Sequence, residues 1–179
     1  RGIDIGAKAE VFRSMRDLAA DGLGILFVTS DLDEVLASVE DRAVLVGHSL
    51  GGYLALAHAA TRPEAARGIV VLNTGPGFRD PEKREGWNER SRRNAHRFGV
   101  PERVAALNLQ EDSVVMDRVA DMATPTLVLA GGHDRPEYSG AGQYLERKMP
   151  DARLVVVGGI CEHMERQPAF NERMRLNRS

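Results

Sequence analysis

The 179-residue sequence has little cysteine, few aromatic residues and no excess of either charge. Cys161 is the only cysteine, so no disulfide can form within the chain and a reducing compartment is expected. A formal net charge of -2 gives no reason to expect nucleic acid or an anionic membrane as a partner. No apolar run approaches the length that spans a bilayer, and the amino terminus lacks a secretory pattern. These absences favour a cytoplasmic protein that acts on small molecules.

Short apolar runs alternate with helical patterns along most of the chain. Strands are expected at residues 24–29, 43–46, 68–72, 126–130 and 153–157, and helices at residues 7–20, 30–39, 53–60, 140–148 and 168–176. This alternation predicts one α/β domain over residues 1–179, with a mostly parallel sheet and helices on both faces.

Residues 75–122 interrupt the alternation and are expected to form a helical lid insertion. A Gly-Pro-Gly turn opens the segment, and a charged helical stretch follows at 82–97. Its basic residues alternate with glutamates, which favours a solvated helix face over a nucleic-acid site. Phe78, Trp87 and Phe98 are candidates to line a substrate pocket. The alternative is that these three side chains only anchor the insertion to the sheet.

The most informative motif is Gly-His-Ser-Leu-Gly-Gly at residues 47–52, directly after the strand expected at 43–46. A G-x-S-x-G sequence between a strand and a helix is typical of a nucleophile elbow. The sharp turn crowds the positions two residues to either side of the serine, Gly47 and Gly51, where only small residues fit. The following residues are small and apolar enough to form a helix packed beneath a sheet. We therefore expect Ser49 to be a catalytic nucleophile.

A serine nucleophile needs a base that takes its proton and a carboxylate that orients the base. With this elbow the chain order is serine, then Asp or Glu, then histidine. Asp134 follows the strand at 126–130, where such sheets build their sites, although it could equally be a helix-cap or turn aspartate. His163 follows the strand at 153–157 and is the expected base; the alternative is an ordinary surface histidine.

The oxyanion of the reaction needs hydrogen-bond donors beside the serine. The backbone N–H of Leu50, the residue after the nucleophile, is the expected first donor. A second donor from a loop after an earlier strand is not identifiable. This chemistry requires neither a metal nor a cofactor.

Four stretches carry a resemblance to a known family: V-L-V-G-H-S-L-G-G at 44–52, V-L-N-T-G-P-G-F-R-D-P at 71–81, P-T-L-V-L-A-G-G-H-D-R-P at 125–136 and, with the His163 loop, Q-P-A-F-N at 167–171. Through them, residues 44–171 resemble the α/β-hydrolase superfamily. The resemblance implies an esterase-like serine hydrolase with Ser49, Asp134 and His163 as its triad, acting on small esters or related acyl substrates. Family members usually place the histidine one or two residues earlier.

Residues 1–46 resemble the carboxyl-terminal part of a sugar-importer ABC ATPase domain. The matching stretches are R-G-I-D-I-G-A-K-A-E-V-F, G-I-L-F-V-T-S-D-L-D-E-V-L and D-R-A-V-L-V. The family's phosphate-binding loop, its signature motif and its magnesium-binding carboxylate are absent from this sequence. Without them, the segment is not expected to bind or hydrolyse ATP.

The chain is therefore interpreted as chimera-like, joined within the strand at 42–46. Residues 1–46 supply an α-β-α-β segment, 47–74 the elbow with its helix and a strand, 75–122 the lid, and 123–179 the acid and histidine half. Both parent folds place another strand between 24–29 and 43–46. Its absence would leave unpaired backbone groups in the sheet.

Three functions are consistent with these patterns. The first is a serine hydrolase of uncertain strength. The second is an inactive, spliced or truncated α/β domain that self-associates through exposed sheet edges. The third, much less favoured, is a fragment of an importer ATPase.

Overall fold

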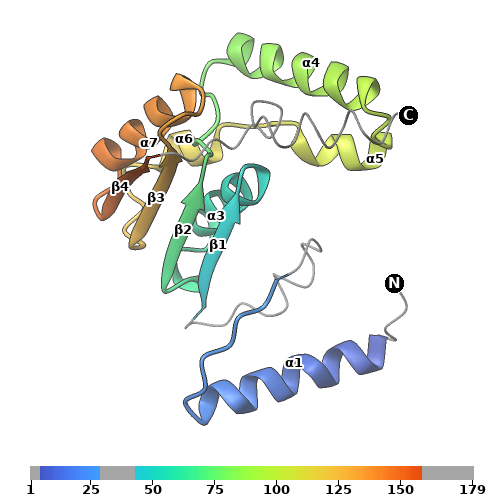
Figure 1. Ribbon diagram of the computed structural model, residues 1–179, viewed down its shortest axis with the longest axis vertical. Helices are drawn as coiled ribbons and strands as arrows, with labels where there is room; N and C mark the ends of the chain where they lie inside the picture. Colours follow the sequence, from blue (N-terminus) through green and yellow to red (C-terminus); the bar gives the residue numbers. More distant parts are fainter. Residues whose placement is uncertain (1–4, 29–42, 159–179) are drawn as a thin grey trace. The chain divides into compact units, whose positions relative to one another are not determined.

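The computed structural model describes residues 5–28 and 43–158 (Figure 1). Contacts between Cα atoms divide the chain into two units, residues 1–40 and 41–179. In the first unit, α1 (Ile5–Ala20) confirms the helix expected at 7–20. A turn at Asp21 and Gly22 follows it, and Gly22 has the positive φ of +90° that favours glycine after a helix.

The strand expected at 24–29 is wrong for the residues that are described. Residues 23–28 form neither a helix nor a strand, and Leu26 and Val28 are 87% and 85% exposed. Phe27 instead packs edge-on against Phe12, with ring centroids 5.6 Å apart. A strand requires a hydrogen-bonded neighbour, and no described strand pairs with this segment. The apolar run at 24–29 indicates a preference for burial, but it does not specify a neighbouring strand with which the segment could pair.

The second unit contains a parallel four-stranded sheet within residues 43–158. Its strands are β1 (Val44–His48), β2 (Gly68–Leu72), β3 (Thr126–Gly131) and β4 (Ala152–Val157), in the order β1-β2-β3-β4. All three pairings are parallel. The sheet and its helices confirm the expected α/β class.

Helix α3 (Leu50–Thr61) forms the crossover from β1 to β2, and α7 (Pro136–Lys148) the crossover from β3 to β4. Helix α3 packs against β1 and β2, and α7 against β3 and β4. The register places Leu45 beside Ile69 and Val71 beside Val128, and all four side chains are buried. The core of the unit therefore lies between this face of the sheet and the two helices.

The opposite face of β1 is open to solvent. Val44 and Val46 are 55% and 65% exposed, because side chains alternate between the faces of a strand. The helices expected at 30–39 and 168–176 lie outside the described residues.

The insertion between β2 and β3 is helical, as expected. It contains α4 (Pro81–Arg97), α5 (Glu102–Ala105), a 3₁₀ turn (Ala106–Asn108) and α6 (Val114–Arg118). Asp80 caps α4 by accepting hydrogen bonds from the backbone N–H groups of Glu82 and Lys83. Another 3₁₀ turn, Pro63–Ala65, lies between α3 and β2.

Candidate functional site

Ser49 lies at the turn between β1 and α3 with φ +51° and ψ -116°. Non-glycine residues rarely adopt such a conformation, which typically costs about 1–3 kcal/mol. The backbone N–H of Ser49 donates to the Leu72 carbonyl at 2.9 Å, so the turn remains bonded to β2. Although Ser49 occupies the N-cap position, its side chain makes no capping hydrogen bond. Ser49 is an exposed residue whose side chain is thus not used to start the helix.

Close backbone packing at the turn explains the requirement for glycine. A Cβ on Gly47 would lie 2.3 Å from the carbonyl oxygen of Gly51. A Cβ on Gly52 would lie 2.6 Å from Cγ2 of Thr74, while one on Gly51 would meet nothing within 4 Å. The expected crowding is confirmed at Gly47 and is wrong at Gly51, because it is the backbone of Gly51, not its side-chain position, that is crowded.

The backbone N–H of Leu50 belongs to the first turn of α3. N–H groups in a first turn have no acceptor within the helix, and the helix dipole is positive there. These properties suit an oxyanion donor, which stays a prediction for Leu50. No described strand precedes β1 in the sheet, so a second donor from such a strand is not assigned.

Asp134 lies in the turn between β3 and α7, and both of its carboxylate oxygens are engaged. Oδ2 accepts a hydrogen bond from Nδ2 of Asn73 at 3.0 Å, and Oδ1 accepts one from the backbone N–H of Arg135 at 2.8 Å. The N-cap of α7 is Arg135, so Asp134 is a turn residue and not the helix cap.

Asn73 is the residue that sequence reasoning missed. It directly follows β2, is only 7% exposed and has φ +46°. Its Oδ1 accepts a hydrogen bond from the backbone N–H of Gly131 at 3.0 Å. Because Asn73 and Asp134 are 61 residues apart in the sequence, no local pattern signals their contact.

The structure brings Ser49, Asn73 and Asp134 to the carboxyl ends of β1, β2 and β3, which are adjacent in the sheet. Ligands of open parallel sheets bind at this edge. His163 lies outside the described residues, so its role as the base stays a prediction.

A pocket of about 170 Å³ lies beside Ser49. Leu50, Tyr53, Phe78, Trp87 and Tyr138 contribute to its lining together with Ser49. Burial, with a smaller contribution from the Asp112 carboxylate, raises the pKa of Tyr53, which therefore keeps its hydroxyl proton near neutral pH.

Two of the three predicted pocket aromatics are in the lining. The Phe78 and Trp87 rings lie 6.1 Å apart between centroids. Phe98 is 64% exposed and is not part of the lining; the Arg97 guanidinium lies over its ring. Phe98 is the C-cap of α4, whereas Trp87 lies in the first half of that helix, so Phe98 lies outside this pocket and its role in substrate binding stays a prediction.

Two neighbouring residues of α4, Trp87 and Asn88, hold this helix against residues 108–110, at the end of the 3₁₀ turn Ala106–Asn108. The buried Asn88 side chain donates to the Gln110 carbonyl at 3.0 Å and accepts from the Gln110 N–H at 2.8 Å. Trp87 Nε1 donates to the carbonyl of Asn108 at 3.2 Å. Trp87 therefore lines the pocket and also joins α4 to another segment of the insertion, whereas anchoring of the insertion to the sheet by Trp87 stays an expectation.

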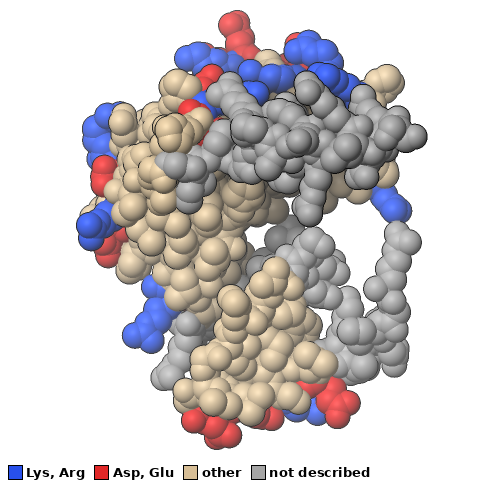
Figure 2. Space-filling model, in the orientation of Figure 1, with Lys and Arg blue, Asp and Glu red and all other residues tan. Residues whose placement is uncertain are grey.

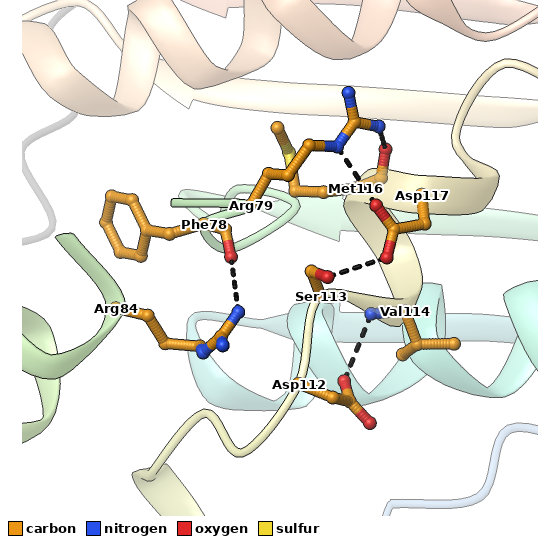
Figure 3. Close-up of polar contacts among 8 residues, drawn as sticks. All are labelled: Phe78, Arg79, Arg84, Asp112, Ser113, Val114, Met116 and Asp117. Carbon is orange, nitrogen blue, oxygen red and sulfur yellow. Dashed lines mark hydrogen bonds and ion pairs between the residues drawn. The ribbon is translucent and has the colours of Figure 1, made fainter. Parts of the chain in front are cut away.

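The two ends of the insertion are tied together by the contacts that Figure 3 shows. Arg79 Nε donates to Asp117 Oδ1 at 2.9 Å, and the same guanidinium donates to the carbonyl of Met116. Ser113 Oγ donates to Asp117 Oδ2 at 2.6 Å. The hydrogen bond from Ser113, followed by that from Arg79, lowers the pKa of Asp117.

Charges of both signs cover α4, as Figure 2 shows on one face. Arg92 pairs with Glu85 at 2.7 Å, and the hydrogen bond from Arg92 lowers the pKa of Glu85. Within residues 5–28 and 43–158, His, Cys, Asp and Glu side chains form no group suited to a metal ion. No helix in these ranges is long and apolar enough to cross a bilayer.

Comparison with known proteins gives two sets of similarities. Residues 12–164 match the model of the "Alpha/beta hydrolase family". MenH from S. aureus superposes with a TM-score of 0.56 and 14% identity, over 87% of this chain and 79% of that chain. A second solved structure is MGS-MChE2, an alpha/beta hydrolase enzyme from a sediment metagenome of the Mar Chica lagoon. It superposes with a TM-score of 0.52 and 21% identity, over 81% of this chain and 64% of that chain.

A further solved structure is Est816, described as an N-acyl homoserine lactone degrading enzyme. Its TM-score is 0.50 with 25% identity, over 81% of this chain and 71% of that chain. The fold similarity to these proteins therefore spans most of the chain.

Sugar importers form the second set. A ribose import ATP-binding protein of Mesorhizobium japonicum is 42% identical over 76 residues, which cover 42% of this chain and 14% of the importer. A ribose import ATP-binding protein of Streptomyces coelicolor is 58% identical over 48 residues, which cover 27% of this chain and 9% of the importer. This chain thus spans only a small part of each importer.

The elbow packing predicts different effects for three alanine substitutions. Gly47→Ala and Gly52→Ala should each lower the free energy of unfolding by about 1–3 kcal/mol or more, because a Cβ has no room there. Gly51→Ala should be neutral or stabilising by up to about 1 kcal/mol, because the space is open and alanine favours helix. Urea unfolding followed by circular dichroism measures all three; equal destabilisation by Gly51→Ala and Gly47→Ala would contradict the described turn.

Proposed function

Because this chain belongs to the alpha/beta hydrolase family, we propose that it is a serine hydrolase acting on small carboxylic esters or related acyl compounds. The observation that carries the proposal is Ser49, held at φ +51° at the start of α3 beside a pocket. A strained, non-capping serine in this place fits a nucleophile and has no evident structural purpose.

In the proposed reaction, Ser49 Oγ attacks the carbonyl carbon of the ester while His163 takes the hydroxyl proton. Asp134 orients the base and stabilises its protonated form. The Leu50 N–H donates a hydrogen bond to the oxyanion of the tetrahedral intermediate. Cleavage of the carbon–oxygen bond releases the alcohol with the proton from the base and leaves an acyl-enzyme, which water then hydrolyses by the same steps.

The pocket beside Ser49 favours a short acyl group. Its volume of about 170 Å³ is small, and the Phe78 and Trp87 rings supply apolar surface for the acyl chain. The similarity to Est816, described as an N-acyl homoserine lactone degrading enzyme, adds an acylated lactone to the substrates worth testing.

Hydrolysis of p-nitrophenyl esters tests this proposal. The purified chain should hydrolyse the acetate and butyrate with higher kcat/KM than the octanoate, because the pocket is small. Ser49→Ala should lower kcat by about 10³-fold or more, and Asp134→Asn by about 10²- to 10⁴-fold. Asp121→Asn, an exposed carboxylate change in the insertion, is the matched control and should retain full activity.

A folded Ser49→Ala protein that hydrolyses these esters as fast as the unsubstituted chain would refute the proposal. An N-acyl homoserine lactone, assayed in parallel with the same variants, shows whether the pocket accepts a cyclic ester.

The second candidate is a non-catalytic α/β domain that self-associates. It is favoured by β1, which is an edge strand of the described sheet and exposes Val44 and Val46. The outer side of an edge strand presents backbone N–H and C=O groups that another strand can pair with.

Self-association through β1 predicts oligomers that dissociate on dilution in sedimentation velocity experiments. Val46→Lys should shift the distribution to the monomer, because a lysine on an edge strand opposes strand pairing. Val104→Lys, which adds the same charge at an exposed position of α5, should leave the distribution unchanged. A monomeric unsubstituted chain with Ser49-dependent activity would exclude this candidate.

A further inference from the structure

We propose that Asn73 is a positioning residue of the proposed hydrolase, whose side-chain amide holds the Asp134 carboxylate in the orientation that the base requires. The inference rests on the proposed function. It starts from an asparagine whose two side-chain polar atoms both bond to the turn after β3.

The hydrogen bonds define which end of the Asn73 amide faces which partner. The Gly131 N–H can only donate, so the atom 3.0 Å from it is the carbonyl Oδ1. Nδ2 is then left to donate to Oδ2 of Asp134, also at 3.0 Å. The Asn73 side chain thus forms hydrogen bonds with both the first and the last residue of the turn from Gly131 to Asp134.

The backbone of Asn73 is itself held in place, which restricts movement of its side chain. Its N–H donates to the Leu129 carbonyl at 2.9 Å, and the residue is only 7% exposed. At φ +46°, asparagine is among the few non-glycine residues accommodated without large strain. A buried side chain with both ends bonded has little freedom to reorient.

The effect on Asp134 follows from a second contact of its carboxylate. Oδ1 already accepts from the Arg135 N–H, and the bond from Asn73 to Oδ2 fixes the second oxygen. One donor on each oxygen restricts rotation of the carboxylate about its bond to Cβ. A fixed carboxylate can select one tautomer and one ring orientation of a histidine base.

The alternative is that Asn73 only stabilises the turn, and Asn73→Asp separates the two roles. Aspartate is nearly isosteric and keeps an acceptor for the Gly131 N–H, but it offers no donor to Asp134 and places a second carboxylate beside it. Asn73→Gly removes both bonds while suiting the positive φ. Asn88→Asp is the matched control, because Asn88 is equally buried at 6% and also bonds at both ends, but inside the insertion.

The experiment measures kcat, KM and melting temperature for p-nitrophenyl acetate hydrolysis by the full chain between about pH 5 and 9. Asn73→Asp should lower kcat about 10-fold or more, with KM within about 2-fold. The acidic limb of its kcat/KM profile should move to higher pH by about one unit, because the added carboxylate favours protonation of the base and of the carboxylate pair. Asn88→Asp should leave this limb in place.

The outcomes separate the inference from the proposed function. Asn73→Asp with unchanged kcat and an unchanged acidic limb would overturn the inference alone, as would losses of kcat that follow only the folded fraction. If Asn73→Asp does not fold, Asn73→Gly decides: reduced kcat at unchanged KM supports positioning, and unchanged kcat refutes it. Absence of Ser49-dependent hydrolysis by the unsubstituted chain would overturn both.

Discussion

The close approach of Gly47 to the backbone of Gly51 is the constraint on which the candidate site depends. Only a residue without a Cβ leaves room for it, since a Cβ on Gly47 would lie 2.3 Å from the Gly51 oxygen. The resulting turn gives Ser49 its φ of +51° and starts α3 directly behind it. Widening the turn would move Ser49 relative to the pocket and disturb the packing of α3 on β1 and β2.

The end of β2 connects this turn to the second half of the site. Thr74 fills the space that the missing side chain of Gly52 leaves, while the neighbouring Asn73 bonds to the turn that carries Asp134. The two consecutive residues after β2 thus contact both turns: Thr74 packs against the turn that carries Ser49, and Asn73 bonds to the turn that carries Asp134. This arrangement explains how parts of the chain far apart in sequence keep a fixed geometry without a metal or a disulfide in the described residues.

Local sequence patterns predicted the features that depend on neighbouring residues, such as the bounds of strands and helices. The strand at 68–72 was predicted with its observed bounds, and helix α7 was found to begin at Pro136 instead of residue 140, since proline suits the first turn of a helix. The strand at 24–29 failed because pairing depends on a distant partner. Motif and chain order predicted Ser49 and Asp134 as site residues, and the structure places both at the carboxyl ends of strands. The role proposed for Asn73 depends on a contact across 61 residues that leaves no periodic signal.

The most direct test of the central claim is the intact mass of the purified chain after reaction with a fluorophosphonate, with Ser49→Ala as its partner sample. A poised nucleophile with a working base predicts a single covalent adduct, located on Ser49 by peptide mapping and absent from Ser49→Ala. A chain that is folded by circular dichroism and forms no adduct would contradict the claim, and would mean that the strained elbow persists without hydrolase chemistry.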